Sequence, residues 1–284
     1  MTHQSYPYIS VIVPTCHRNV LLAKCLDCLA PGVQTLPPEQ YEVIVTDDGT
    51  RSTAEALVQV SYPWVRWVAG PRHGPAANRN NGAKSALGQW LAFTDDDCLP
   101  TPGWLEGYAQ AAEAENCRVL EGKTTCEAGF ASPLYEAPIN LEGGLLWSCN
   151  FAVRADLFRE MGGLDESFAF YMEDIDFRER LRERGESVPF VSQAAVDHPP
   201  RRQASGYKKG KAYEARVQHW HKKPQKTPLF ISHLQHVKHG LWHIRRFRRS
   251  KDTAQALASL LIETVYIAAH LPFWERKYHN RYRA

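Results

Sequence analysis

The stretch Trp90-Leu-Ala-Phe-Thr-Asp-Asp-Asp-Cys-Leu-Pro100 constrains the fold more than any other part of the chain. Its apolar run up to Phe93 predicts a buried strand, and three consecutive carboxylates, Asp95 to Asp97, follow directly. Three like charges at the end of a buried strand repel one another and are costly to desolvate unless they share a cation. Carboxylate oxygens suit Mg²⁺ or Mn²⁺, which also bind phosphate oxygens. The stretch therefore predicts a site for a metal and a diphosphate.

The acidic triplet has two other interpretations. Acidic triplets commonly lie in solvated loops, and by itself this one fits such a loop. An EF-hand loop starting at Asp95 needs a polar ligand at its fifth position and glycine at its sixth. The chain has Leu99 and Pro100 there, which excludes the EF-hand.

Short apolar runs alternate with helix-like segments along the first part of the chain. The predicted strands are residues 8–14, 41–46, 64–68 and 89–93. The predicted helices are residues 20–29, 52–60 and a segment ending at Leu87, which a polar stretch at 74–81 precedes. This alternation predicts an α/β fold in which helices cover both faces of a mostly parallel sheet.

Ligands of such sheets bind beyond the carboxyl ends of the strands. Three of the predicted strand ends bear polar groups of the expected kind: Thr15 to Arg18, Asp47 with Asp48, and the acidic triplet. The chain has no G-x-G-x-x-G after its first strand and no G-x-x-x-x-G-K-[ST], which argues against dinucleotide dehydrogenases and P-loop enzymes.

A second acidic group comes later in the chain. Predicted elements before it are a helix at 104–116, a strand at 118–126, a buried run at 145–153 and a helix at 154–161. Glu173 and Asp174 then begin a helix that ends at Arg184, before Gly185. The helix dipole favours ionised carboxylates at this position, although such charge is also ordinary at a helix N-terminus.

Composition and charge suggest two regions. The chain has 284 residues, of which 44% are hydrophobic, as expected for a globular protein with a sizeable core. Residues 201–284 contain 19 Lys and Arg against four Asp and Glu, a formal charge of +15, whereas residues 1–200 contain 15 against 27, a charge of −12. We therefore expect a catalytic domain at 1–200 and a basic, aromatic-rich, mainly helical region at 201–284.

Cysteine usage and the N-terminus bear on the compartment. The seven cysteines are odd in number and scattered, which suits a reducing compartment better than a disulfide framework. The first eight residues are polar and lack the apolar core of a signal peptide. We expect a cytoplasmic protein.

The basic region contains a largely apolar helical stretch, residues 254–274. Gln255, Ser259, Glu263 and His270 form one polar stripe along it, which argues against a membrane-spanning helix. The stretch instead predicts an amphipathic helix in the interface of an anionic membrane, on its inner face. Packing on the catalytic domain and a homodimer contact are alternatives, and nucleic-acid binding fits less well.

Taken together, the motifs resemble those of the inverting family 2 glycosyltransferases, which have the GT-A fold with a Rossmann-like nucleotide-binding half. The resemblance covers roughly residues 8–200, and five motifs occur in the family's order and spacing. They are ISVIVPTCHR, EVIVTDDGTRS, GPAANRNNGAKSALGQWLAFTDDDC, SCNFAVRADLFREMGGLDESF and YMEDIDFRERLRERG. Each motif is weak by itself, but the five together are specific.

The resemblance implies transfer of a sugar from a nucleotide-diphosphate sugar to a glycan or a lipid-linked glycan, with Mn²⁺ or Mg²⁺. The donor would be bound by Thr15, Arg18, Asp47, Asp48, Arg79, Asp95 and Asp96. The metal would be bound by Asp95 and Asp97 of the D-x-D motif and by His198. The acceptor would contact Trp147 and Glu173, and Asp174 matches the family's catalytic base.

The chain departs from the family's pattern at two points. Cys16 and His17 replace the usual Asn after the first strand, and no Gln-x-x-Arg-Trp follows the Glu-Asp pair. The second absence argues against a processive polymerase. Two alternatives stay open: a sugar nucleotidyltransferase, which should have a Gly-rich basic loop after its first strand, and a non-catalytic module that binds nucleotide-sugars or nucleic acid.

Overall fold

The computed structural model describes residues 7–51, 53–168, 171–223 and 228–282. The chain forms two compact units. Unit 1 comprises Met1–Glu127, Pro138–Ala169 and Glu173–Pro199, and unit 2 comprises Ala128–Ala137, Phe170–Met172 and Pro200–Ala284. Residues 128–137 thus group with the C-terminal unit, whereas the charge pattern places them in the first domain. The reason is a strand pairing that the charge pattern does not show.

An eight-stranded sheet forms the centre of unit 1. Its strands are β1 (Ile9–Thr15), β2 (Tyr41–Asp47), β3 (Val65–Ala69), β4 (Trp90–Thr94), β5 (Leu99–Pro100), β6 (Val119–Thr125), β8 (Asn150–Arg154) and β9 (Phe190–Asp197). Their spatial order is β3-β2-β1-β4-β8-β6-β9-β5. β1 is parallel to β2 and β4, β2 to β3, and β6 to β9, whereas β8 is antiparallel to both of its neighbours. The predicted mostly parallel sheet is confirmed.

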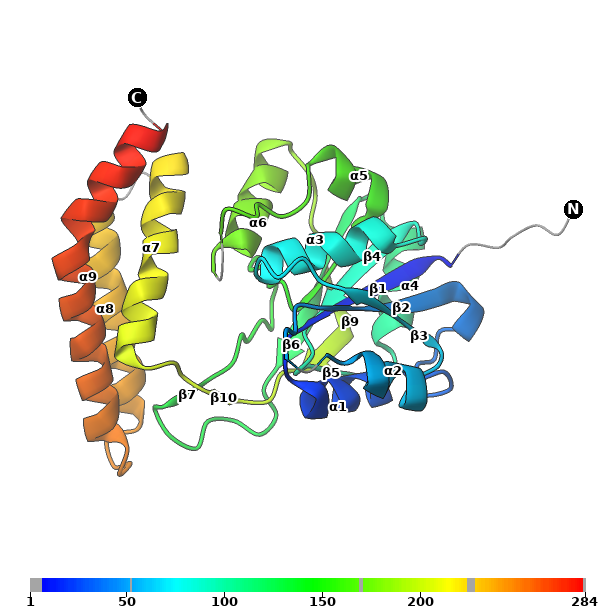
Figure 1. Cartoon of the computed structure of the whole chain (residues 1–284), viewed down its shortest axis with the longest axis horizontal. Coiled ribbons are helices and arrows are strands. Elements are labelled where there is room, and N and C mark those ends of the chain that lie inside the picture. Colours follow the sequence, from blue (N-terminus) through cyan, green and yellow to red (C-terminus); the bar gives the residue numbers. More distant parts are fainter. Residues whose placement is uncertain (1–6, 52, 169–170, 224–227, 283–284) are drawn as a thin grey trace, which may run out of the picture. The chain divides into compact units, whose positions relative to one another are not determined.

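Helices cover both faces of this sheet (Figure 1). They are α1 (Asn19–Leu29), α2 (Glu55–Ser61), α3 (Pro75–Ser85), α4 (Trp104–Ala114), α5 (Ala155–Glu160) and α6 (Glu173–Glu183), with a short 3₁₀ turn at Pro38–Gln40. Side chains alternate between faces along each strand. Val11 and Val13 of β1 accordingly join the core beneath α1, α2 and α4, and Ile12 joins the core beneath α3, α5 and α6.

Two local predictions differ from the structure, and one strand is not predicted. The polar stretch expected to precede a helix is itself helical, because α3 begins at Pro75, after Gly74 with φ +94°. The predicted buried run at 145–153 is a strand only from Asn150, since Leu146 has positive φ and residues 145–149 form a loop. The sequence pattern also missed β9, whose burial alternates irregularly along its length.

Unit 2 consists of a short antiparallel pairing and three helices. β7 (Tyr135–Glu136) pairs with β10 (Arg201–Arg202), which explains why residues 128–137 belong to this unit. The helices are α7 (Gly206–Lys222), α8 (Leu229–Arg246) and α9 (Thr253–Tyr282). They lie side by side as a bundle (Figure 1), in which Tyr213, Ile267 and Trp274 are buried together. The expected helical character of the region is confirmed for its described residues.

Within the bundle, the charged residue at the middle of α9 is satisfied by its neighbours. Glu263 is buried and binds Lys209 Nζ of α7 at 3.0 Å and His236 Nε2 of α8 at 2.7 Å. Glu263 therefore does not place a charge on the outer surface of α9, although the sequence pattern predicts that it belongs to a polar stripe that argues against a spanning helix. By length and composition alone, α9 is long and apolar enough to cross a membrane. One such helix is only weak evidence for a membrane span.

The buried amide of Asn150 generates a prediction for stability. Its oxygen accepts hydrogen bonds from Trp104 Nε1 at 2.8 Å and Tyr108 Oη at 2.7 Å, and its nitrogen donates to two carbonyl groups, those of Lys123 and Ala194. We expect Asn150→Ala to lower the free energy of unfolding by about 3 kcal/mol or more, because it leaves buried donors and acceptors unpaired. Urea denaturation measures the change, with the exposed Gln59→Ala as a control expected to stay within about 0.5 kcal/mol. Equal stability of both variants would contradict this account.

Candidate active site

The carboxyl ends of β1 and β4 meet through one buried carboxylate. Because the two strands are adjacent and parallel, Thr15 and Asp96 come together although they are 81 residues apart. The Thr15 hydroxyl donates to Asp96 at 2.6 Å, and the Arg18 guanidinium donates to both Asp96 and Asp97, the latter at 2.8 Å. Burial raises the pKa of Asp96 to about 7, against the opposing effect of Arg18. Asp96 thus anchors Thr15 and Arg18 at the predicted nucleotide position.

A buried guanidinium connects the two acidic groups of the sequence. Arg79, on α3, donates to Asp95 through Nη2 and to Glu173 Oε1 through Nη1 at 3.3 Å. Burial favours the neutral form of Arg79, but Asp95 and Glu173 outweigh it and raise the Arg79 pKa. Burial likewise opposes ionisation of Asp95, but Arg79 outweighs it and lowers the Asp95 pKa. Residues 79, 95 and 173 therefore form one ion-paired group.

Glu173 and Asp174 lie at the N-terminus of α6, as predicted. Burial raises the pKa of Glu173 to about 7, and Asp174 adds to the effect. Burial also raises the pKa of Asp174, although backbone N–H groups of Ile175 and Ser148 bind its carboxylate and favour ionisation. A carboxylate whose pKa is raised is a stronger base than an ordinary aspartate. The backbone contact also binds Asp174 to Ser148, which directly follows Trp147, the residue predicted to meet the acceptor.

His198, the predicted metal ligand furthest along the chain, faces Asp97, the last acid of the triplet. It follows β9 and is fully buried, with Nε2 at 3.5 Å from Asp97 Oδ1. Neither of these two atoms has a hydrogen-bond partner among the described residues. Because the Pro199 carbonyl only accepts, its 3.0 Å contact with His198 Nδ1 is a hydrogen bond from an Nδ1 proton, and in the neutral ring Nε2 then offers its lone pair toward Asp97. In that neutral form two acceptor atoms face each other, an arrangement that a shared cation stabilises.

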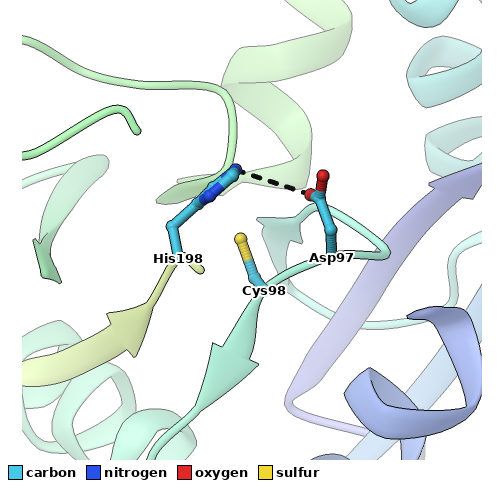
Figure 2. A group of neighbouring side chains, drawn as sticks. All are labelled: Asp97, Cys98 and His198. Atoms are coloured by element: carbon cyan, nitrogen blue, oxygen red, sulfur yellow. Dashed lines mark ion pairs between the residues drawn. The ribbon is translucent and has the colours of Figure 1, made fainter. Parts of the chain in front are cut away.

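A sulfur atom completes this group. Figure 2 shows the Cys98 thiol pointing into the space between Asp97 and His198. One ligand atom from each of the three residues lies within 4.8 Å of the others, and no other such group of three occurs among the described residues. Cys98 is not among the residues predicted from the sequence, although it directly follows the acidic triplet. Asp95, predicted as a metal ligand, binds Arg79 through one carboxylate oxygen, and its role toward a metal stays a prediction.

Two of the predicted donor-binding acids hold the backbone of neighbouring loops. Asp47 is buried, and its carboxylate accepts hydrogen bonds from the N–H groups of Gly49 and Ala54 and from Trp67 Nε1. Asp48 accepts from the N–H groups at positions 72 and 74, at 2.8 and 3.2 Å. These contacts shape the rim of the site beside Thr15. Their predicted contact with the nucleotide remains a prediction.

The loop before Trp147 is held by a buried acid that the sequence analysis did not single out. Glu121 of β6 accepts hydrogen bonds from the backbone N–H groups of residues 144–146 and from the Asn140 amide. From the other side, Arg178 of α6 donates to the carbonyls at 144 and 145, at 3.2 and 3.1 Å. Trp147 is half-buried, and its indole N–H donates to the Ile139 carbonyl at 3.3 Å. The predicted acceptor residue therefore sits on a fixed loop.

Comparison with known proteins agrees with this geometry. Residues 10–127 match the family described as "Glycosyl transferase family 2", a segment that includes β1 to β6 and the acidic triplet. The chain is 27% identical over 209 residues to the Glycosyltransferase AglE of Haloferax volcanii, covering 69% of this chain and 68% of the relative. It is 33% identical over 111 residues to the GalNAc(5)-diNAcBac-PP-undecaprenol beta-1,3-glucosyltransferase of Campylobacter jejuni, covering 37% of this chain and 35% of that protein.

Solved structures show the same fold. S. aureus TarS 1-349 in complex with UDP matches with a TM-score of 0.56 and 17% identity, covering 96% of this chain and 91% of that one. The same fragment in a second structure gives a TM-score of 0.58. The predicted resemblance to family 2 glycosyltransferases and the predicted GT-A fold are confirmed, and the comparisons support a glycosyltransferase.

The raised pKa of Glu173 predicts how stability varies with pH. In the folded chain its pKa is about 7, above the value of about 4.3 expected when unfolded, so between these values the native state binds more protons. The free energy of unfolding should therefore fall as the pH rises from about 4 to about 7. Glu173→Gln should flatten this fall by on the order of 1 kcal/mol, measured by urea denaturation in metal-free buffer. The exposed Glu113→Gln on α4 should leave the fall unchanged, and equal curves for both variants would refute the assignment.

Proposed function

We propose that the chain is an inverting glycosyltransferase that moves a sugar from a nucleoside-diphosphate sugar to a hydroxyl group of a glycan or lipid-linked glycan. The observation that carries the proposal is the ion-paired group of Arg79, Asp95 and Glu173. This group joins the acidic triplet to the N-terminus of α6. The residues that would bind the donor and the residue that would act as the base can therefore share one site. The arrangement suits a displacement in which the base and the leaving diphosphate are separate groups.

In this proposal Asp174 removes the proton of the acceptor hydroxyl. Burial makes its carboxylate more basic, and the N–H groups of Ser148 and Ile175 keep it oriented. The fixed loop that ends at Trp147 would position the acceptor sugar beside it. Attack by the deprotonated oxygen on the anomeric carbon, opposite the leaving diphosphate, inverts the configuration at that carbon in a single step.

The donor would lie against Thr15, Arg18 and Asp96. Arg18 spans Asp96 and Asp97 and would lie near the diphosphate, where its charge favours the leaving group. That a structure of similar fold is in complex with UDP makes a UDP-sugar the first donor to test. The name of the Campylobacter relative includes an undecaprenol-PP carrier, which supports a lipid-linked acceptor for this chain too.

The unpartnered atoms of Asp97 and His198 fit a divalent cation, and Mn²⁺ and Mg²⁺ are the ions we propose. When bound, such an ion neutralises charge that develops on the leaving diphosphate. Asp97 and His198 supply one oxygen and one nitrogen, and we assign Cys98 as a third, sulfur ligand. The imidazole nitrogen favours Mn²⁺ over Mg²⁺, since Mg²⁺ prefers oxygen ligands. The Pro199 carbonyl, by binding Nδ1, fixes the His198 ring in the orientation that presents Nε2.

The assignment of Asp174 predicts the effect of removing its basicity. We expect Asp174→Asn to lower kcat for transfer at least about 100-fold, because the amide cannot accept the proton. Binding of UDP with Mn²⁺, followed by thermal shift, should stay close to that of the wild type. Glu183→Gln, at an exposed position of the same helix, is the control and should turn over like the wild type. Turnover near the wild-type value would remove Asp174 from the mechanism.

The assignment of Cys98 predicts an optical signature with Co²⁺. Binding of Co²⁺ to the wild type should produce a sulfur-to-metal charge-transfer band in the near ultraviolet, since a coordinating thiol is deprotonated. Cys98→Ser should lose this band but still bind Co²⁺ through the other two residues, and Cys25→Ser, at another buried cysteine, should retain it. His198→Ala should weaken binding at least about tenfold by calorimetry. A band that persists in Cys98→Ser would exclude the sulfur ligand.

A further inference from the structure

Two helices of unit 2 expose a large number of apolar side chains. The exposed large hydrophobic residues of α8 are Phe230, Ile231, Leu234, Leu241 and Trp242. Those of α9 are Leu257, Leu261, Ile262, Val265 and Phe273. We call these two sets the α8–α9 apolar stripes. Ten such residues on two neighbouring helices exceed the scattered apolar exposure of an ordinary surface.

The stripes follow helical periodicity. Leu257, Leu261 and Val265 recur every fourth residue and share one side of α9, whereas Ala256, Leu260 and Ile267 lie on the side buried in the bundle. From Thr253 to Trp274 the sequence has a single Asp, Glu, Lys or Arg, and this residue, Glu263, is buried against Lys209 and His236. The outward side of α9 is therefore uncharged over about 20 residues, or about 30 Å.

Basic residues flank the stripes at both ends of α9. Arg245, Arg246, Arg248, Arg249 and Lys251 lie at the α8–α9 junction. Arg276, Lys277 and Arg281 follow the uncharged stretch in the last turns of α9. The junction also has an open hollow lined by Ala131, Arg246, Phe247, Arg248, Arg249 and Ser250. Three of its lining residues are arginines, the side chain that most often binds phosphate groups through paired hydrogen bonds.

The positive charge around the α8–α9 apolar stripes distinguishes between their possible binding partners. A second copy would bring two regions of formal charge +15 together, which repel each other. Nucleic acid would match the charge but would leave the apolar stripes in water. A bilayer with anionic headgroups satisfies both, because acyl chains cover apolar side chains and headgroup phosphates bind the arginines.

The bundle also decides how α9 would meet a bilayer. α7 packs along α9, with Gly206 against Ser259, Gly210 against Tyr266 and Glu214 bound to Lys277. α7 exposes charged side chains, among them Lys208 and Lys211. A spanning α9 would carry these charges into the hydrocarbon layer, which is costly. The helix therefore fits an orientation in the plane of the interface.

We propose that the α8–α9 apolar stripes dock unit 2 on an anionic membrane surface, with the arginine-lined hollow holding a lipid headgroup phosphate. This extends the proposed function by naming the surface at which a lipid-linked acceptor would be met. Vesicle binding needs no turnover, so the two proposals can fail independently.

The test is sedimentation of the full chain with vesicles of phosphatidylcholine, with and without phosphatidylglycerol. The wild type should bind the anionic vesicles and lose affinity at high salt. Leu261→Gln with Val265→Gln, at positions 64% and 59% exposed, should weaken binding at least about tenfold, as should Arg248→Glu with Arg249→Glu. Val60→Gln, at an 83% exposed apolar position in unit 1, is the matched control and should bind like the wild type.

Three results would overturn the proposal. The first is wild-type affinity of both double variants for the anionic vesicles, with melting temperatures showing that all variants are folded. The second is a wild-type dimer that Leu261→Gln with Val265→Gln converts to a monomer without any vesicle binding, which would assign the stripes to a second copy. The third is binding of an oligonucleotide by a chain that ignores the vesicles.

Discussion

The buried guanidinium of Arg79 is the interaction on which the site depends. A lone charge of this kind in a protein interior costs several kcal/mol, and only well-placed partners offset it. Asp95 from the strand end and Glu173 from α6 provide these partners. In turn, the charge of Arg79 reduces the repulsion between the carboxylates of Asp95 and Glu173. Removal of Arg79 would leave the two acids facing each other without a cation, at the place where the substrate would bind.

The helix that bears Arg79 shows how the fold supplies this position. α3 is polar, yet most of its residues from Ala76 to Gly82 are buried, because its amides bind the sheet and a later turn. Asn78 binds Thr46 and the Thr15 carbonyl, and Asn80 binds the backbone of Leu164. Such a helix is held by hydrogen bonds rather than by an apolar stripe. Its rigidity is what fixes the Arg79 side chain between two acids from distant parts of the chain.

The two units concentrate charges of opposite sign. Unit 1 gathers carboxylates at one edge of the sheet and balances them with Arg18, Arg79 and, in the proposed function, a cation. Unit 2 gathers cations at the ends of α9 and keeps Glu263 inside the bundle, so that the outer side of that helix is uncharged. The separation of charge along the sequence thus corresponds to two units with different proposed partners: a diphosphate for the first, and an anionic surface for the second.

The sequence by itself determined the alternation of strands and helices, the acids at the strand ends and the family resemblance, because these depend on local periodicity and on motif order. It predicted α1 and β4 closely for this reason. Only the tertiary structure decided which acids meet which cations. The pairing of Arg79 with Glu173 spans 94 residues, and no local pattern specifies it. The same holds for Cys98 beside His198, for Glu121 beneath the loop before Trp147, and for the burial of Glu263, since each is fixed by how separate elements pack.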